Sequence, residues 1–142
     1  KELPCYLPLL RRSGRYQRRV VHFLLPMFPG YVFCALDDDS YSRLLASGHV
    51  AGRLMVDAAA EERLIAELQE IRKFEQLAQV GQVVVMPELA VGRRVVVRAG
   101  PLRGISGIIT RRRKATLVAL NLEILGQCVA AEVDAGDLEL ED

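Results

Sequence analysis

Histidines, aspartates and cysteines are the side chains in this sequence that could do chemistry, and none has the partners that catalysis or metal binding needs. The two histidines, His22 and His49, have no evident carboxylate or cysteine partner. The aspartates at 37–39 lack the later glutamate of a calcium loop, and a helix cap explains them more simply. The sequence has no glycine-rich phosphate loop, no HExxH and no GxSxG. We therefore expect no enzyme activity, no metal and no cofactor.

The cysteines point to packing rather than to chemistry. Cys5, Cys34 and Cys128 are far apart, odd in number and without CxxC spacing, so we expect neither a zinc site nor a disulfide framework. Each lies in an apolar run and is interpreted as a small core residue, which fits a reducing cytoplasm. No apolar run approaches the ~20 residues of a membrane span. We therefore expect a cytoplasmic protein with no membrane partner.

Charge is distributed unevenly along the chain, although the formal net charge is only +1. Residues 132–142 contain acids and no base, whereas residues 1–19 contain one acid, Glu2, among many bases. The bases of that first stretch are Lys1, Arg11, Arg12, Arg15, Arg18 and Arg19. A basic end of this kind indicates a polyanion nearby, and the alternative is a solvated surface.

The first part of the chain predicts strands around a basic turn. Apolar runs at 5–10 and 20–25 flank a polar, glycine-containing stretch, which is typical of a hairpin with a basic tip. Residues 30–36 predict a third strand, and residues 49–56 a weaker one.

Two helices are expected beside these strands. The run Asp37–Ser40 offers the cap of a short helix that ends near Gly48. Asp57 offers the cap of a longer helix over 61–79. The apolar stripe of the longer helix is Leu64, Ile65, Leu68, Ile71 and Ala78, with Phe74 at its edge and Leu77 off it. We expect this stripe to pack in the core rather than to bind a partner.

The second part of the chain predicts short strands separated by turns. The expected strands are 94–98, 105–110, 116–124, 128–133 and 137–140, with glycines between them. Such a set in about 50 residues favours a closed or half-closed barrel. Residues 80–90 are interpreted as a linker, with a brief extended segment at 83–86. The predicted organisation is therefore a first domain at 1–79, a linker at 80–90 and a barrel at 91–142.

Several stretches of the sequence resemble one family of transcription factors. Val95–Ile109 resembles a KOW motif, and Ile124–Gln127 with Ala131–Val133 resembles the end of the NusG carboxy-terminal barrel. Pro26–Phe33 resembles the signature strand of the NusG amino-terminal (NGN) domain. The resemblance is closest to the specialised RfaH-like and UpxY-like paralogues. It implies an α+β fold, with an NGN-type antiparallel sheet and helices followed by a small SH3-like KOW β-barrel.

The resemblance implies a transcription elongation or antitermination factor. In that family the NGN domain binds the clamp helices of the largest RNA polymerase subunit. The matching residues here are Phe28, Pro29, Tyr31 and Phe33. Aromatic side chains give a large contact area at low entropic cost. The alternative is that Phe28 and Phe33 are core residues, and strand alternation places Tyr31 and Phe33 on one face.

The resemblance also implies nucleic-acid and protein partners. The basic hairpin would lie beside the polymerase cleft, and Arg43 and Arg53 would face the non-template DNA strand. The run Arg111–Lys114 is either a solvated hairpin tip or an RNA contact. In the family, the barrel binds a small-subunit ribosomal protein or the termination factor Rho. The matching residues here are Leu102, Ile105, Ile124 and Leu125, and Gln127 replaces a frequent arginine.

The chain also departs from the family, and rival interpretations remain. The aromatic strand and helix that open the family's domain have no counterpart here, so we expect an incomplete first sheet. One rival is a ribosome-associated, RNA-binding KOW protein, which explains residues 91–142 but gives no role to residues 28–33. The other is the housekeeping NusG itself.

Overall fold

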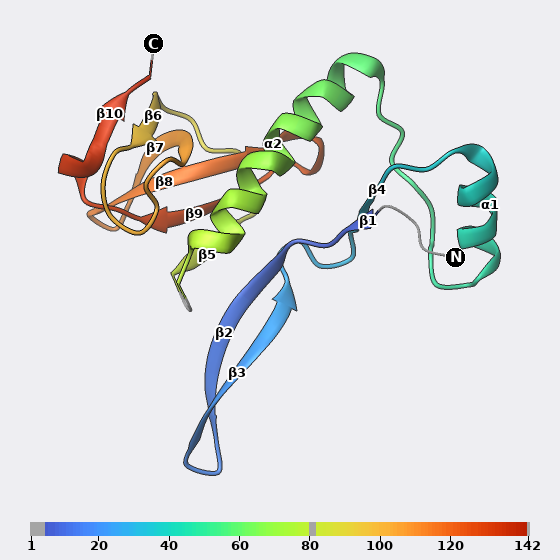
Figure 1. Cartoon of the computed structure of the whole chain (residues 1–142), viewed down its shortest axis with the longest axis horizontal. Coiled ribbons are helices and arrows are strands. Elements are labelled where there is room, and N and C mark those ends of the chain that lie inside the picture. Colours follow the sequence, from blue (N-terminus) through green and yellow to red (C-terminus); the bar gives the residue numbers. More distant parts are fainter. Residues whose placement is uncertain (1–4, 80–81, 142) are drawn as a thin grey trace.

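The computed structural model describes residues 5–79 and 82–141. In these residues the fold is α+β, with two α-helices and antiparallel strand pairs in three sheets. The largest sheet has six strands. Figure 1 shows this sheet at one end, helix α1 at the other, and a long hairpin that projects away from both.

The projecting hairpin is formed by β2 (Leu9–Tyr16) and β3 (Arg19–Pro26). The predicted hairpin is confirmed, but its basic tip is much shorter than expected. The ladder runs from Leu9↔Pro26 to Tyr16↔Arg19, so most of the arginines lie in the strands. A two-residue turn matches the twist of the strands and lets pairing continue through the polar stretch.

Two very short strands, β1 (Cys5–Tyr6) and β4 (Phe33–Cys34), form a separate pair. The strand predicted at 30–36 is therefore reduced to two residues, and residues 49–56 form no strand. A strand needs a neighbour for its backbone groups. The described part of the chain offers none beside 49–56.

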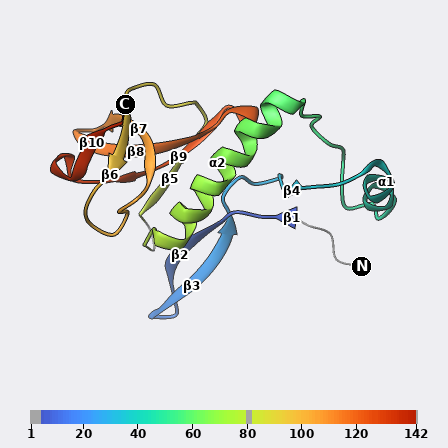
Figure 2. The same ribbon diagram turned by 45° about the horizontal axis from the view of Figure 1, so that its top comes forward.

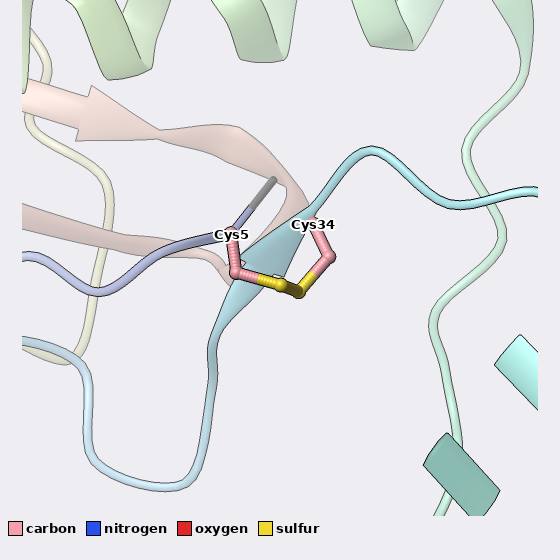
Figure 3. Close-up of a disulfide and its surroundings, with 2 residues drawn as sticks. All are labelled: Cys5 and Cys34. Carbon is pink, nitrogen blue, oxygen red and sulfur yellow. A yellow bond between two sulfur atoms is a disulfide. The ribbon is translucent and has the colours of Figure 1, made fainter. Parts of the chain in front are cut away.

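Cys5 and Cys34 form a disulfide across this pair, with their Cα atoms 4.1 Å apart. Figure 3 shows the bond joining β1 to β4. The prediction that both are reduced core residues is therefore wrong. The reason is the strand register, which sets the two cysteines directly opposite each other and which sequence spacing does not show. Cys128 is a free, buried cysteine, as predicted.

Both predicted helices form, and both have the predicted caps. Helix α1 (Asp38–Ala46) begins where Asp37 accepts a hydrogen bond from the Ser40 N–H at 2.7 Å. This backbone hydrogen bond holds the pKa of the Asp37 carboxyl below its usual value. Helix α2 (Ala58–Leu77) begins where Asp57 accepts from the Ala60 N–H at 2.8 Å.

The buried face of α2 differs in part from the predicted stripe. Ile71 and Phe74 are fully buried, so Phe74 lies at the centre of the face rather than at its edge. Ile65 and Leu77 are both exposed, the first against the prediction and the second as predicted. Figures 1 and 2 show α2 between the six-stranded sheet and strands β1 and β4. The helix is thus buried where these two parts meet rather than along its whole length.

The six-stranded sheet contains the remaining strands. Its order is β10-β6-β7-β8-β9-β5, and every neighbouring pair is antiparallel. The strands are β5 (Val83–Met86), β6 (Arg94–Val97), β7 (Ser106–Arg112), β8 (Ala115–Leu122), β9 (Gln127–Glu132) and β10 (Leu138–Leu140). Two 3-10 turns, η1 (Glu123–Leu125) and η2 (Ala135–Asp137), connect β8 to β9 and β9 to β10. The sheet contains the five predicted strands and one more.

The additional strand, β5, coincides with the brief extended segment that was expected at 83–86 within the linker. It pairs with β9 from Val83↔Ala131 to Met86↔Cys128, so residues 83–86 belong to the sheet. A run of three valines favours a strand, and β9 offers an edge for it to complete. The flanking Gly81 lies outside the described residues, and Pro87 follows directly after the strand.

One hydrophobic core joins the first part of the chain to the sheet. Leu10 and Met27 from the base of the hairpin, with Phe74 from α2, belong to the same cluster as Val97 and Leu120 of the sheet. Each large apolar side chain contributes about 1.5–3 kcal/mol when buried. The two predicted domains therefore share a core in this structure.

Candidate functional site

The aromatic stretch that follows β3 is organised by a tight turn. The Tyr31 N–H donates to the Phe28 carbonyl at 3.1 Å, and Gly30 has φ of 88°. Proline at the second position and glycine with positive φ at the third are typical of a type II turn. The turn leaves Phe28 inside, at 1% exposure, and Tyr31 outside, at 42%.

The four predicted polymerase contacts therefore divide into two groups. Phe28 is buried and Phe33 half buried, and their rings meet edge to face with centroids 6.4 Å apart. The alternative expectation was that both side chains pack in the core, and Phe28 meets it fully. Pro29 and Tyr31 are exposed. Val32, which the sequence did not single out, is 53% exposed beside them.

The base of the hairpin is held to α2 by Glu75. Its carboxylate accepts from the Tyr6 hydroxyl at 2.5 Å and from the Leu9 N–H at 3.1 Å. Burial, followed by this hydrogen bond, raises the pKa of Tyr6. The Arg72 guanidinium lies 5.7 Å from the centroid of the Tyr6 ring. Sequence patterns gave no signal of these contacts, because Glu75 is 66 or more residues from its partners.

Strand β3 exposes an unusual amount of apolar surface. The exposed large apolar residues of this strand are Val20, Val21, Phe23, Leu24 and Leu25. Alternating residues point to opposite faces, so both faces of the strand are apolar and open. In the described residues β3 pairs only with β2, which leaves one edge free. The apolar run had predicted a strand, but periodicity cannot tell whether a neighbour covers it.

The arginines of the β2–β3 hairpin are mostly exposed. Arg12 is the exception: it is half buried and donates to the Val83 carbonyl at 2.9 Å. The turn residues Gln17 and Arg18 have φ of 48° and 67°. Left-handed backbone costs an L-residue roughly 1–2 kcal/mol, so this turn is strained.

The other two predicted nucleic-acid residues lie elsewhere and are paired with acids. Arg43 lies 3.8 Å from Asp39, and Arg53 lies 3.2 Å from Asp38. The Arg53 guanidinium also stacks 4.1 Å from the centroid of the Tyr41 ring. These arginines form one cluster around α1, which Figure 1 shows away from the hairpin turn. The structure therefore does not bring the two groups of predicted arginines together.

The predicted partner face of the sheet is partly buried. Leu102 and Ile105 are at most 1% exposed, so neither can contact a partner in this structure, against the prediction. The loop after β6 folds back, with the Gly104 N–H donating to the Val97 carbonyl at 2.8 Å. This fold carries both side chains into the core. Ile124 and Leu125, in η1, are half buried.

Helix α2 lies beside this face and contacts it through polar groups. Glu70 accepts from the Ser106 N–H at 3.1 Å, and Glu67 accepts from the Glu123 N–H at 3.2 Å. Burial raises the pKa of Glu67. Arg63 forms an ion pair with Glu123 at 2.8 Å. The helix therefore occupies surface next to Ile124 and Leu125.

A second basic turn connects β7 to β8. Arg111 and Arg112 end β7, and Arg113 and Lys114 form the turn with φ of 51° and 69°. All four are exposed, in agreement with the predicted hairpin tip. This turn has the same two-residue form as the β2–β3 turn.

Comparisons with protein-family models, curated proteins and solved structures find no match for this chain. In residues 5–79 and 82–141, no group of three or more His, Cys, Asp or Glu side chains could hold a metal ion. None of the helices described is both long and apolar enough to cross a bilayer.

Proposed function

We propose that this protein is a transcription elongation or antitermination factor that binds RNA polymerase and recruits a second partner. The observation that carries the proposal is the turn at Pro29–Gly30. It exposes Tyr31 and Val32 beside a strand, β3, whose apolar side chains are open to solvent. An aromatic residue next to open apolar surface is the chemistry of a binding hot spot.

The clamp helices of the largest polymerase subunit are the proposed partner of this surface. Helices dock through apolar residues on one side, and an apolar groove or strand face accepts them. Tyr31 keeps its hydroxyl at the rim, where water remains. Phe28 is left out of the proposed contact, because its ring is buried.

The six-stranded sheet is proposed to act as a KOW barrel that recruits the second partner. Its support is the antiparallel strand order together with the resemblance of Val95–Ile109 to a KOW motif. The proposed partners are a small-subunit ribosomal protein or the factor Rho. Ile124 and Leu125 remain the half-exposed residues for this contact. The proposed place of action is the cytoplasm.

The β2–β3 hairpin is proposed to contact a polyanion near the polymerase cleft, with non-template DNA as the nearest candidate. Arg11, Arg15, Arg18 and Arg19 are exposed along it. Such contacts release counterions from phosphates and are therefore salt-dependent. The acid-paired Arg43 and Arg53 have less free charge to offer.

A second candidate function, an RNA-binding protein associated with the ribosome, is favoured by one observation. Arg111–Lys114 form an exposed basic turn on the sheet. That reading leaves Tyr31 and β3 without a role, so it ranks second.

The polymerase proposal is tested by a pull-down of core RNA polymerase. Tyr31→Ala and Val32→Ser should each weaken binding, with about a tenfold loss for the tyrosine. Val91→Ser is the matched control, because Val91 is 88% exposed in another part of the chain. Equal binding by Tyr31→Ala and Val91→Ser, both with native thermal melts, would contradict the proposed contact.

A further inference from the structure

The β2–β3 and β7–β8 hairpins share the same strained turn. Gln17, Arg18, Arg113 and Lys114 are the non-glycine residues with positive φ in the described part of the chain. Asparagine and glycine adopt this conformation at lower cost, yet three of these four residues are basic. Strain held at such residues points to a role at the turn itself.

In the part of the chain that the structure describes, the cations around the two turns are exposed and form no ion pair. They are Arg11, Arg15, Arg18 and Arg19 on one hairpin and Arg111, Arg112, Arg113 and Lys114 on the other. The ion pairs found within 5–79 and 82–141 use other cations: Arg43, Arg53, Arg63, Lys73, Arg94 and Arg98. Each turn therefore carries free positive charge, which attracts polyanions.

Strand β2 of the first hairpin and the turn of the second hairpin both lie close to the start of β5. Arg12 donates to the Val83 carbonyl at 2.9 Å. The neighbouring Gln82, with Arg112 and Arg113, lines a pocket of about 750 Å³. Figure 1 shows the β2–β3 hairpin leaving from beside β5. One short segment, Gln82–Val83, therefore lies between the two hairpins.

We propose that the two turns form one binding surface for the phosphodiester backbone of a nucleic acid. The backbone would run from the β2–β3 turn, past Gln82, to the β7–β8 turn. Glu132, Asp134 and Asp137 also line the pocket, so the phosphates pass over the exposed turns rather than into it. This inference rests on the polyanion role proposed for the β2–β3 hairpin and is independent of the polymerase contact.

Binding of labelled oligonucleotides to the intact chain, without polymerase, tests the proposal. Arg18→Ser with Arg19→Ser removes two cations from the first turn, and Arg113→Ser with Lys114→Ser removes two from the second. Arg94→Ser with Arg98→Ser is the control, because it changes the net charge equally but removes cations that pair with Glu141 and Glu139.

An oligonucleotide long enough to reach both turns should bind each turn variant about tenfold more weakly or worse, because both contacts act together. The control should change by less than about threefold, as expected for a general charge effect. The slope of log affinity against log salt should fall by about 0.7 per lost contact on single strands and about 0.9 on duplexes.

Three outcomes would overturn the proposal. One is an equal loss in the control and the turn variants. Another is an equal loss for the long oligonucleotide and for a short one that reaches a single turn, because the turns would then act separately. The third is unchanged binding by both turn variants.

Tighter binding of single-stranded RNA or of duplex DNA would support the proposal and identify the source of the phosphates. If Arg113→Ser with Lys114→Ser melts early, Arg113→Asn with Lys114→Gly removes the same charges in a favoured turn.

Discussion

At the scale of single residues, the two basic turns place positively charged side chains at left-handed backbone positions that suit glycine better. A left-handed residue with a Cβ costs roughly 1–2 kcal/mol, and Gln17 and Arg18 both adopt this conformation. Glycine avoids the clash but loses roughly 0.5–1 kcal/mol more conformational entropy on folding. The sequence thus holds a turn that is less stable than an Asn-Gly turn and more positively charged.

Arg18→Gly should therefore raise the free energy of unfolding by roughly 0.5–1 kcal/mol. This value is the strain that glycine relieves minus the extra conformational entropy that glycine loses on folding. Arg15→Gly is the matched control, since Arg15 lies within strand β2 and glycine there should lower stability by roughly 0.5–1 kcal/mol. Urea unfolding of both variants measures the difference. A loss of stability in Arg18→Gly as large as that in Arg15→Gly would show that the turn is not strained.

At the scale of elements, local signals predicted structure well and contact partners poorly. Asp37 and Asp57 marked both helix starts because a cap acts within three residues. The Pro29–Gly30 turn is also encoded locally, although residues 30–36 were expected to form a strand. The burial of Leu102 and Ile105, the β5–β9 pairing and the Cys5–Cys34 bond all depend on distant neighbours. Alternation shows that a strand has two faces, but not which face is covered.

The β1–β4 pair depends on its disulfide, because two-residue strands have little stability of their own. The disulfide closes a loop of 29 residues. In the chain-entropy model, the lost freedom raises the free energy of the unfolded chain by about 3–4 kcal/mol. Reduction, or Cys34→Ser, should therefore speed amide hydrogen exchange at Tyr6 and Phe33 and leave α2 protected.

Cys128→Ser serves as the control, because Cys128 is buried and free and its loss should not alter the response to a thiol reductant. Unchanged exchange at β1 and β4 after reduction would show that packing alone holds the pair.

A reducing cytoplasm keeps most thiols reduced. In the proposed cytoplasmic location, the loosened, reduced form is therefore the relevant one.

At the scale of the whole molecule, helix α2 connects the hairpin to the six-stranded sheet. Its Glu75 binds the hairpin side through Tyr6 and Leu9, and its Glu70 binds the Ser106 N–H of the sheet. Phe74 lies between these residues in the common core. The hairpin is also held by Leu10 in the common core and by the hydrogen bond from Arg12 to Val83.

Phe74→Ala should lower the free energy of unfolding by about 3–5 kcal/mol, because a fully buried ring leaves a cavity that closes only in part. Leu77→Ala is the matched control on the same helix, and its 40% exposed side chain should cost less than about 1 kcal/mol. Amide signals of β2 and of β8, followed through the same denaturant titration, should lose protection at one shifted midpoint, since both strands rest on one core. If β8 kept its wild-type midpoint while β2 unfolded early, the hairpin and the sheet would be independent units, as the expected linker at 80–90 had implied.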